Sequence, residues 1–418
     1  MAYQKMKGTL DFFGKDAKEF RYIENVARKE VEAFGFSEVI TPIFESTDLF
    51  LRSVGETSDI VTKEMYTFLD KGERSLTLRP EGTASIARLF IENKLYINPG
   101  LKKYYYFGPM FRYERPQAGR YRQFHQFGAE VYGDLSPYIN SEVILSAYNI
   151  LQKLGIKNIV LKINTIGDFE SRNRYSIALK EYFKDNLNDL CDDCKARYEK
   201  NPMRILDCKV DKNNPILLNA PKIKDYLTID AKENFNKVQQ TLKAMNIPFV
   251  CDDSLVRGLD YYTDLVFEFI NLDDGLAICA GGQYAEMIKS FGGPDLGGIG
   301  YAFGVERIKN VMESDNLFPE LEQKTDVVII SLDDESKISA LNLMNILRDN
   351  GISSDMDYTN NNLKPQFKLV DRLNPKAIVI IGEAERLNKE YNVKNNITKN
   401  SELVKEENII DYIKKMEK

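Results

Sequence analysis

Four arginines stand close together in the segment FRYERPQAGRYRQFHQFGAE, at positions 112, 115, 120 and 122. The planar guanidinium group of arginine holds phosphate or carboxylate oxygens at two points, so this density of arginine suggests that the segment binds phosphates. A charged loop that is simply solvated is the competing interpretation, and the local sequence does not decide between the two.

The residues after these arginines predict a strand with one face suited to a small polar ligand. Side chains of a strand alternate between its two faces, so four residues of the stretch 124–130 share a face: Phe124, Gln126, Gly128 and Glu130. Together they offer a flat ring, an amide, a space and a carboxylate. His125, the only histidine of the chain, points to the opposite face, so we expect it not to contact a ligand.

Three other segments carry polar residues in positions that suit a ligand. In TLRPEGTAS, residues 77–85, a turn presents Glu81 and Thr83, which suit an ammonium group or simply cap the following helix. In LVRGLDYYTD, residues 255–264, Tyr261 and Tyr262 are adjacent in an expected strand, so their phenols should face opposite ways. In DLGGIGYAFGVERI, glycines lead into a helix that holds Arg307, but their spacing is not that of a P-loop.

Three cysteines form the pattern CDDC…C at positions 191, 194 and 208, which invites comparison with zinc sites. A structural zinc site takes four ligands, and the next candidate in the sequence, Cys251, lies far away. We therefore expect no protein-bound metal and interpret Cys191, Cys194 and Cys208 as a cluster of surface or half-buried thiols. Five cysteines, an odd number in a long chain without an export signal, indicate reduced thiols in the cytoplasm.

The elements that must position these residues describe an α+β domain over residues 1–322. Apolar residues at spacings of three and four predict a helix over 20–34, and a strand interrupted by Pro42 follows. Two strand-like runs within 101–133 predict a hairpin with a basic loop. A polar stretch of helical pattern predicts a helical insertion at about 167–245, before strand patterns return.

After Phe318 and Pro319, strand and helix patterns alternate with short connections. This texture predicts a separate α/β domain over residues 325–418. The stretch 386–405 is rich in Asn and Lys and poor in apolar residues, so we expect a long exposed loop with irregular strands there.

The composition excludes several classes of protein. The 418 residues are 43% hydrophobic and 29% charged, which is typical of a folded globular chain. The net charge of -6 gives no overall basic footprint, although a local basic patch can still bind nucleic acid. No run approaches the ~20 apolar residues of a membrane span, so we expect a cytoplasmic protein without a membrane partner.

Taken in their order along the chain, these segments resemble the motifs of a class II aminoacyl-tRNA synthetase, and specifically of the histidyl-tRNA synthetase family. GFSEVITPIFE is similar to the first class II motif, FRYERPQAGRYRQFHQFGAE to the second, and GIGYAFGVERI to the third. TLRPEGTAS and LVRGLDYYT resemble the histidine-specific signatures of the family. The resemblance covers nearly the whole chain, including a C-terminal domain similar to the anticodon-binding domain of the family.

The resemblance implies the class II antiparallel sheet with flanking helices and a two-step reaction. Histidine attacks the α-phosphate of ATP to give histidyl-adenylate and pyrophosphate, and the histidyl group then moves to the terminal ribose of tRNA(His). Histidine, ATP with Mg²⁺, and tRNA(His) are the implied ligands. A homodimer through the helix and strand of residues 20–45 is also implied.

The resemblance assigns roles to individual residues. Arg112 and Arg257 are the implied catalytic residues, on opposite sides of the α-phosphate. The implied histidine-binding set is Glu81, Gly82, Thr83, Arg112, Gln126, Glu130, Arg257, Tyr261, Tyr262 and Tyr284. The implied ATP-binding set is Arg112, Glu114, Arg120, Phe124 and Arg307. Arg115 and Gln117 are expected to touch the acceptor end of the tRNA.

One segment departs from the family pattern. The family usually reads AGGRYDGL where this chain has AGGQYAEMI, so the wall around Tyr284 is expected to differ at Gln283, Ala285 and Glu286. The alternative function is that of a non-catalytic relative, the synthetase-like regulatory subunit of ATP phosphoribosyltransferase. It typically lacks the anticodon domain and parts of the signatures, which this chain keeps. An RNA-binding or scaffold protein without turnover is a third interpretation.

Overall fold

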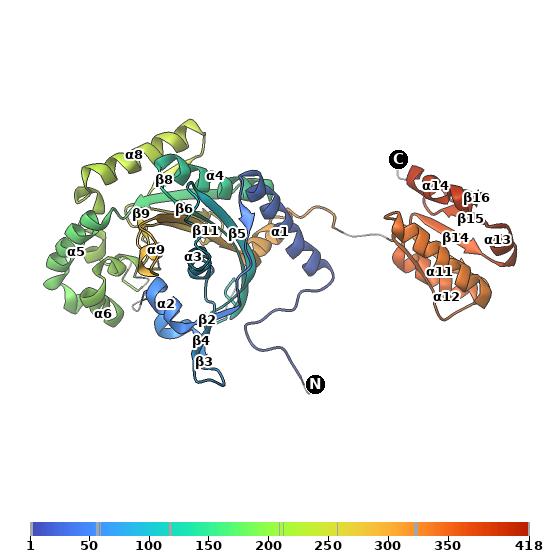
Figure 1. Cartoon of the computed structure of the whole chain (residues 1–418), viewed down its shortest axis with the longest axis horizontal. Helices are drawn as coiled ribbons and strands as arrows, with labels where there is room; N and C mark the ends of the chain where they lie inside the picture. The colour runs from blue at the N-terminus through green and yellow to red at the C-terminus, as the bar shows by residue number, and fades with distance from the viewer. Residues whose placement is uncertain are drawn as a thin grey trace. The chain divides into compact units, whose positions relative to one another are not determined.

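The computed structural model divides the chain into two compact units, Met1–Pro319 and Glu320–Lys418 (Figure 1). The described residues are 3–55, 58, 60–116, 119–208, 210–211, 213–256, 258–321 and 325–416. Two residues of the expected site, Arg257 and Gln117, therefore lie outside the described part of the chain.

A mixed sheet is the centre of the larger unit. Within the described ranges it contains eight strands: β1 (Ser37–Glu38), β5 (Lys102–Phe111), β6 (Gln123–Gly133), β7 (Ile159–Thr165), β8 (Phe249–Cys251), β9 (Thr263–Asn271), β10 (Ala277–Tyr284) and β11 (Gly297–Gly304). Their order is β1-β5-β6-β11-β10-β9-β7-β8. Neighbours pair antiparallel except at the two ends, where β1 with β5 and β7 with β8 are parallel. The expected α+β class, antiparallel sheet and β5–β6 hairpin are confirmed.

Helices cover both faces of this sheet. The main core includes residues of α1 (Lys15–Ala33), α4 (Pro137–Lys153), α8 (Ile229–Ala244) and α10 (Val305–Ser314). A second core includes residues of α3 (Thr83–Glu92) and α9 (Met287–Ser290). The adjacent strand residues Tyr105 and Tyr106 belong to the first and second core respectively, as alternation along β5 requires. The predicted helix is confirmed, because α1 buries Phe20, Ile23, Ala27 and Val31.

The predicted strand around Pro42 is split into two short pieces. β1 ends at Glu38, and β2 (Phe44–Ser46) joins β4 (Ser75–Leu78) and β3 (Tyr66–Leu69) in a separate small sheet. α2 (Thr47–Val54) and the π-helix η1 (Ile60–Glu64) connect these strands. Proline has no N–H to donate to a sheet ladder. Near this break in the strand, the buried guanidinium of Arg79 donates hydrogen bonds to two backbone carbonyl oxygens, those of Thr41 at 3.0 Å and Pro109 at 2.9 Å.

The insertion before α8 is helical, as predicted. It contains α5 (Phe169–Lys184), η2 (Leu187–Asp189), α6 (Asp192–Lys200), η3 (Pro202–Asp207), α7 (Pro215–Leu218) and η4 (Ile223–Asp225). These elements have a small hydrophobic core of their own, which contains Tyr175, Phe183, Cys194 and Cys208. Figure 1 shows α5 and α6 at the left of the larger unit.

The smaller unit has the α/β architecture that its sequence predicted. Its sheet order is β13-β12-β14-β15-β16, with bounds Ser354–Met356, Val327–Ser331, Ala377–Ile381, Glu390–Asn395 and Ser401–Lys405. Its helices are α11 (Asp334–Asp349), α12 (Leu363–Leu373), α13 (Glu383–Asn388), η5 (Glu406–Asn408) and α14 (Ile409–Lys415). The expected irregular loop over 386–405 is wrong, because β15 and β16 form a regular antiparallel hairpin. Three buried apolar residues, Tyr391, Val393 and Val404, anchor it to the core.

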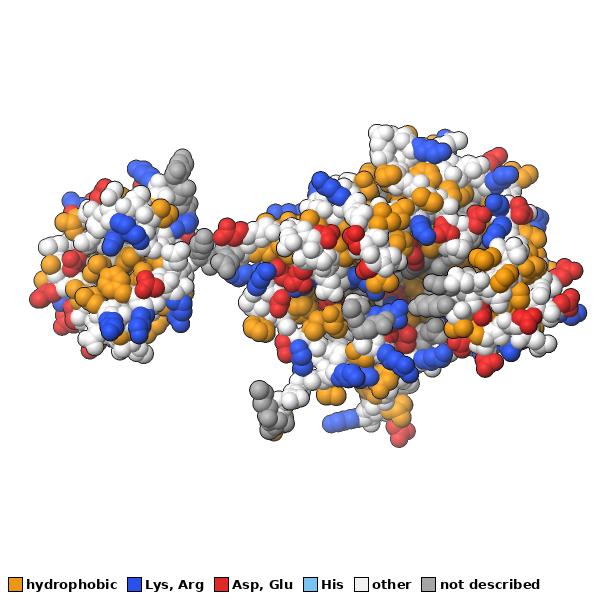
Figure 2. All heavy atoms as spheres, turned by 180° about the vertical axis from the view of Figure 1, so that it is seen from behind, with side chains coloured by type: hydrophobic (Ala, Val, Ile, Leu, Met, Phe, Trp, Pro, Cys, Tyr) orange, Lys and Arg blue, Asp and Glu red, His pale blue; other side chains and the backbone are white. Residues whose placement is uncertain are grey.

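The surface carries charges of both signs. In the space-filling view, Lys and Arg side chains alternate with Asp and Glu over both units, with apolar side chains scattered between them (Figure 2). None of the helices in the described ranges is long and apolar enough to cross a membrane.

Candidate active site

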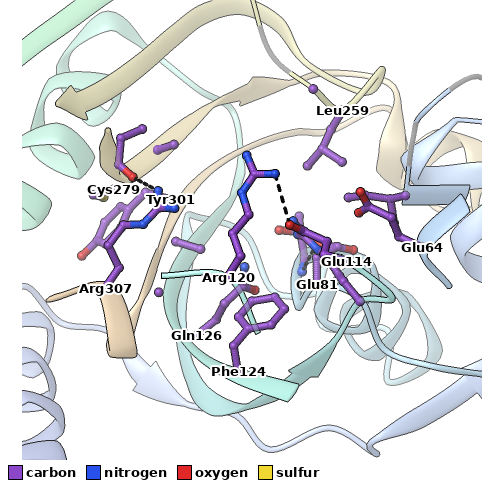
Figure 3. A pocket seen from close by; sticks show the side chains of 18 of the residues that line it. Glu64, Glu81, Glu114, Arg120, Phe124, Gln126, Leu259, Cys279, Tyr301 and Arg307 are labelled. Carbon is purple, nitrogen blue, oxygen red and sulfur yellow. Dashed lines mark hydrogen bonds and ion pairs between the residues drawn. The ribbon is translucent and has the colours of Figure 1, made fainter. Parts of the chain in front are cut away.

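The expected ligand-binding residues meet in a cavity of about 530 Å³ on one face of the sheet (Figure 3). Those that line it are Glu81, Thr83, Arg112, Glu114, Arg120, Phe124, Gln126, Glu130, Tyr261, Tyr262, Tyr284 and Arg307. Gly82 is the N-cap of α3, between two of them, whereas Arg115 is exposed outside the cavity. Phe124, Gln126 and Glu130 project from the same face of β6, as the alternation predicted.

Two buried carboxylates form the floor of the cavity. The carboxylate of Glu81 accepts the backbone N–H groups of Thr83 at 2.6 Å and Ala84 at 2.9 Å, at the start of α3. The Thr83 hydroxyl donates to Glu130 at 2.6 Å. Burial raises the pKa of both carboxyl groups, and that of Glu130 reaches about 8, because little water remains to solvate the charge. A cationic group entering here would stabilise the ionised carboxylates.

Tyr284 closes the cavity over Glu130. Its hydroxyl donates to Glu130 Oε2 at 2.6 Å, and its side chain is fully buried. The residues that depart from the family pattern make contacts elsewhere: Gln283 accepts a hydrogen bond from Asn140 at 3.0 Å, on α4. The departure therefore leaves Tyr284 inside the cavity.

The prediction that the phenols of Tyr261 and Tyr262 face opposite ways is wrong. Both border the cavity, and their ring centroids are 4.6 Å apart. They precede β9 in a turn, where the backbone N–H of Asp260 bonds to the carbonyl of Val54. Strict alternation applies only to an extended backbone, and the backbone turns here before β9 begins.

Three of the expected arginines, Arg112, Arg120 and Arg307, also line the cavity. Nε of Arg112 donates to the carbonyl of Pro80 at 2.9 Å, and its guanidinium lies 5.4 Å from the centre of the Phe124 ring. Arg120 pairs with Glu114 at 3.4 Å. Burial lowers the pKa of Arg307, and the nearby charge of Arg120 lowers it further. Because these two cations repel each other, an anion between them would be stabilised.

The other two arginines of the loop serve different purposes. Arg122 stacks on Tyr113, with its guanidinium 4.1 Å from the ring centre, and Arg115 is exposed. The solvated-loop interpretation thus fits part of the cluster, and the ligand-binding interpretation fits Arg112 and Arg120.

Comparison with known proteins identifies the family. Residues 8–308 match the model described as histidyl-tRNA synthetase, and residues 326–416 match that of the anticodon-binding domain. The chain belongs to the histidyl-tRNA synthetase family.

Individual members of the family are similar along the whole chain. A histidine–tRNA ligase of Geobacillus sp. (strain WCH70) is 43% identical over 419 residues, 99% of each chain. One of Staphylococcus aureus (strain JH9) is 43% identical over 415 residues, 98% of this chain and 99% of the relative. The crystal structure of apo S. aureus histidyl-tRNA synthetase has a TM-score of 0.84 at 39% identity, covering 99% of this chain and all of that one.

The alternative relative is more distant. A structure titled as an ATP phosphoribosyltransferase regulatory subunit/histidyl-tRNA synthetase from Bacillus halodurans has a TM-score of 0.67 at 19% identity, covering 91% of this chain and 98% of that one. At this identity the likeness shows the fold alone.

His125 does not line the cavity, as the alternation predicted. Its Nδ1 lies 2.8 Å from a carboxylate oxygen of Glu306, which also accepts the backbone N–H of His125. The imidazole packs against the rings of Phe20 and Phe107, at centroid distances of 4.7 and 6.0 Å. In this member of the family the single histidine therefore joins β6 to α10 on the core side of the sheet.

Sequence reasoning missed Tyr106 as a cavity residue. It projects from β5, pairs with Gly128 of β6, and lines the cavity. An added Cβ at Gly128 would lie 2.4 Å from its ring, so glycine is needed there for the ring to fit. The Tyr106 hydroxyl is buried and has no hydrogen-bond partner among the described residues, which leaves it available to a ligand. The sequence signal for Tyr106 was the predicted hairpin, because pairing its two strands brings Tyr106 opposite Gly128.

A substitution at Gly300 tests the position of the Glu130 carboxylate in the cavity. An alanine Cβ at this position would lie 1.8 Å from a carboxylate oxygen of Glu130 and 2.7 Å from the backbone oxygen of Ala129. We expect Gly300→Ala to displace Glu130 and to lower kcat/KM for histidine in amino-acid-dependent pyrophosphate exchange by roughly 10-fold, the equivalent of one lost hydrogen bond to a charged group. Gly304→Ala on the same strand is the control, because its Cβ comes no closer than 3.9 Å to a neighbour. Equal rates in the two variants would contradict the assigned place of Glu130.

Proposed function

We propose that this protein is a histidine–tRNA ligase, which activates histidine with ATP and transfers it to the 3′ end of tRNA(His). The observation that carries the proposal is the cavity itself. Two buried carboxylates, several phenols and three arginines line it together, in a chain of this family. The carboxylates and phenols suit a zwitterionic substrate with a polar ring. The arginines suit a second substrate that carries a polyphosphate.

The first half-reaction is an in-line displacement at the α-phosphorus of ATP. A carboxylate oxygen of histidine forms a new bond to the α-phosphorus. The bond between the α-phosphorus and the oxygen that bridges it to the β-phosphorus breaks, and pyrophosphate leaves. Such a reaction depends on positioning and on neutralising negative charge. Arg112 supports both tasks, because the carbonyl of Pro80 fixes its guanidinium beside Phe124 in the cavity. We assign the opposite position to Arg257.

The carboxylates and phenols of the cavity suit both the α-ammonium group and the ring of histidine. Glu81, Thr83 and Gln126 would hold the α-ammonium group. Glu130 and one phenol of Tyr261 or Tyr262 would bond the two ring nitrogens, with Tyr284 holding Glu130 in place. Side chains without these nitrogens would leave buried polar groups unpaired, and this mismatch supplies the selectivity.

The arginine side suits ATP. Phe124 offers a flat ring under the adenine, and Glu114 an acceptor for its amino group. Arg120 and Arg307 would hold the outer phosphates, with a phosphate replacing Glu114 as the partner of Arg120. No group of three carboxylates at metal-binding spacing lines the cavity among the described residues. We therefore expect Mg²⁺ to enter with the ATP phosphates and not on a protein site.

In the second half-reaction a ribose hydroxyl of tRNA(His) attacks the carbonyl carbon of the adenylate, and AMP leaves. We assign contact with the acceptor end to the loop residues Arg115 and Gln117. The anticodon-binding domain at residues 326–416 supports tRNA as the partner. A translation enzyme of this kind acts in the cytoplasm, where we place the protein.

We also propose a homodimer through residues 20–45. Ile40, Ile43 and Phe44 follow α1 and are 82, 44 and 52% exposed. Exposed apolar side chains gathered in one segment are typical of an interaction surface. Sedimentation should give the mass of two chains, and a monomer at micromolar concentration would refute this interface.

The activity is tested by exchange of labelled pyrophosphate into ATP with purified protein. We expect exchange with histidine and none with the other amino acids, followed by charging of tRNA(His). A folded protein that shows no histidine-dependent exchange would overturn the ligase assignment and favour a regulatory or scaffold role.

A further inference from the structure

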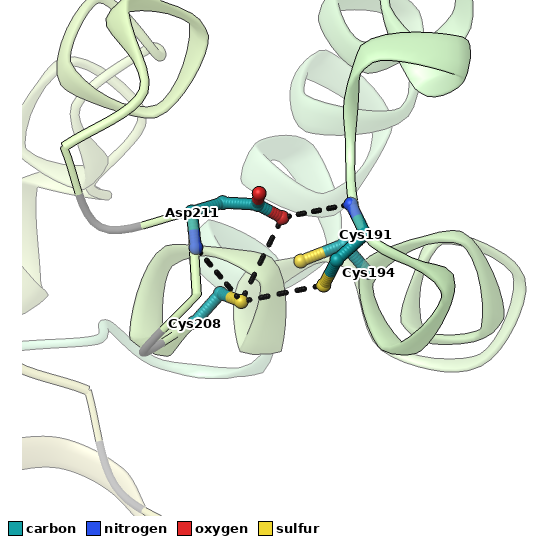
Figure 4. Close-up of side chains that lie close together, drawn as sticks. All are labelled: Cys191, Cys194, Cys208 and Asp211. Carbon is teal, nitrogen blue, oxygen red and sulfur yellow. Dashed lines mark hydrogen bonds between the residues drawn. The ribbon is translucent and has the colours of Figure 1, made fainter.

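Three cysteines and an aspartate converge in the helical insertion (Figure 4). Cys191 is the N-cap of α6, Cys194 lies in the first turn of that helix, and Cys208 and Asp211 follow η3. Their sulfur and carboxylate atoms all lie within 4.8 Å of one another. The sequence offered only three ligands for a metal, and the fold adds Asp211 as the fourth.

We propose that Cys191, Cys194, Cys208 and Asp211 bind one structural Zn²⁺ ion. The Sγ atoms of Cys191 and Cys208 are 3.6 Å apart, and Cys208 Sγ is 3.7 Å from Asp211 Oδ2. With Zn–S bonds of about 2.3 Å and Zn–O bonds of about 2.0 Å, a tetrahedral site has S–S edges of roughly 3.8 Å and S–O edges of roughly 3.5 Å. These two distances match the edges of a tetrahedral coordination shell, and the Cys194 sulfur lies within 4.8 Å of the other three ligand atoms.

The order of the ligands in the chain supports the same conclusion. Two residues separate Cys191 from Cys194, and two separate Cys208 from Asp211. Paired ligands at this spacing on two segments are characteristic of structural zinc sites, here with a carboxylate in the last position.

One backbone hydrogen bond joins the two ligand pairs, and a second lies within the pair Cys208 and Asp211. The N–H of Cys191 donates to Asp211 Oδ2 at 3.0 Å, and the N–H of Asp211 donates to Cys208 Sγ at 3.4 Å. Outer contacts of this kind orient metal ligands. These hydrogen bonds place the carboxylate of Asp211 among the three thiols. A set of three thiolates and one carboxylate would select a divalent ion that binds soft ligands, such as Zn²⁺.

The insertion gains most from such an ion because its core is small. Cys194 is fully buried and Cys208 is 4% exposed, both inside the separate core of α5 to η4. Small cores of this kind are often reinforced by a metal or a disulfide. The thiol protons pass to solvent when the ion binds.

The ion would also stabilise one wall of the active site. Arg204 lies on η3, between the two ligand pairs, and donates to the carbonyl of Gly258 at 2.9 Å. It also pairs with Asp260 at 3.4 Å. Both residues belong to the segment that carries Tyr261 and Tyr262, so fixing η3 supports the turn that presents these phenols.

The first experiment uses the full-length protein, purified without chelator and with a tag that does not bind metal. We expect elemental analysis to find about one zinc per chain, as a closed four-ligand site requires. Replacement by Co²⁺ should give the visible bands of tetrahedral cobalt with a thiolate charge-transfer band. This measurement needs no variant, so it does not depend on whether a variant folds.

The second experiment compares variants. Cys194→Ser should lose the zinc, whereas Cys251→Ser, an exposed cysteine outside the cluster, should keep it. Asp211→Ala should bind zinc more weakly by about 10-fold or more, since the loss of even an outer contact costs 10–100-fold in affinity. Chelation of the wild-type protein should lower its midpoint of thermal unfolding and should not change that of Cys194→Ser.

Three results would overturn the site. They are wild-type protein with only trace metal after zinc is supplied, equal zinc in the wild type and Cys194→Ser, and a Cys191–Cys208 disulfide found by mass spectrometry of the protein purified under reducing conditions. None of them bears on histidine-dependent exchange, so the zinc site and the ligase function are tested separately.

Discussion

Arg112→Ala should lower histidine-dependent pyrophosphate exchange by about 10²–10³-fold, the typical loss when one preorganised donor to a transition state is removed. Arg112 is held inside the cavity by its bond to the Pro80 carbonyl and by its position beside Phe124. Without it the negative charge that spreads over the α-phosphorus has no fixed partner on this side. The loss should fall mainly on kcat, because the contact strengthens as that charge develops.

Arg115→Ala is the matched control for this experiment. Arg115 lies three residues away on the same loop and is exposed outside the cavity. Exchange, which needs no tRNA, should stay near the wild-type rate in this variant, while KM for tRNA(His) rises in the charging assay. Near-wild-type exchange in Arg112→Ala would refute the role of Arg112, and equal losses of exchange in both variants would point to a general defect of the loop.

Glu130→Gln should lower kcat/KM for histidine by about 10²-fold, since a buried hydrogen bond to a charged group is worth up to ~3 kcal/mol. The carboxylate of Glu130 stands between Thr83 and Tyr284 at the end of the cavity assigned to the imidazole. An amide of the same shape keeps the packing but cannot ionise when a cationic group of the substrate binds. KM for ATP should not change, because the arginine side of the cavity is untouched.

The same variant should respond differently to pH. Burial raises the pKa of Glu130 from 4.5 to about 8 in the folded protein. Between these two values the folded protein holds a proton that the unfolded chain releases, so the free energy of unfolding falls as the pH rises through this window. Glutamine does not titrate, so Glu130→Gln should lack this loss. Between about pH 5 and about pH 9 its free energy of unfolding should therefore rise relative to that of the wild type by on the order of 4–5 kcal/mol, from ~1.4 kcal/mol per pKa unit.

Thermal unfolding of both proteins at about pH 5 and about pH 9 measures this difference. The wild-type midpoint should fall relative to that of Glu130→Gln as the pH rises. Glu286→Gln removes an exposed carboxyl group near the end of β10 and is the control. A gap between Glu130→Gln and the wild type that stays constant across the range would show that Glu130 does not carry a raised pKa.

Much of the site followed from local rules. The period of two along β6 placed Phe124, Gln126 and Glu130 on one face and His125 on the other, because an extended backbone fixes the direction of each side chain. The same rule failed for Tyr261 and Tyr262, where the backbone turns before β9. Apolar periodicity also missed the hairpin within residues 386–405, because only three buried apolar residues anchor it to the core.

The sequence by itself determined the family, the two domains' architectures and the orientation of the only histidine. These rest on motifs and on periodicities that each segment carries alone. The tertiary structure decided which remote segments meet. Tyr106 faces Glu130 because β5 pairs with β6, and Asp211 joins the three cysteines because η3 folds back on α6. Contacts between remote segments depend on how the whole domain packs, and a short stretch of sequence does not contain that information.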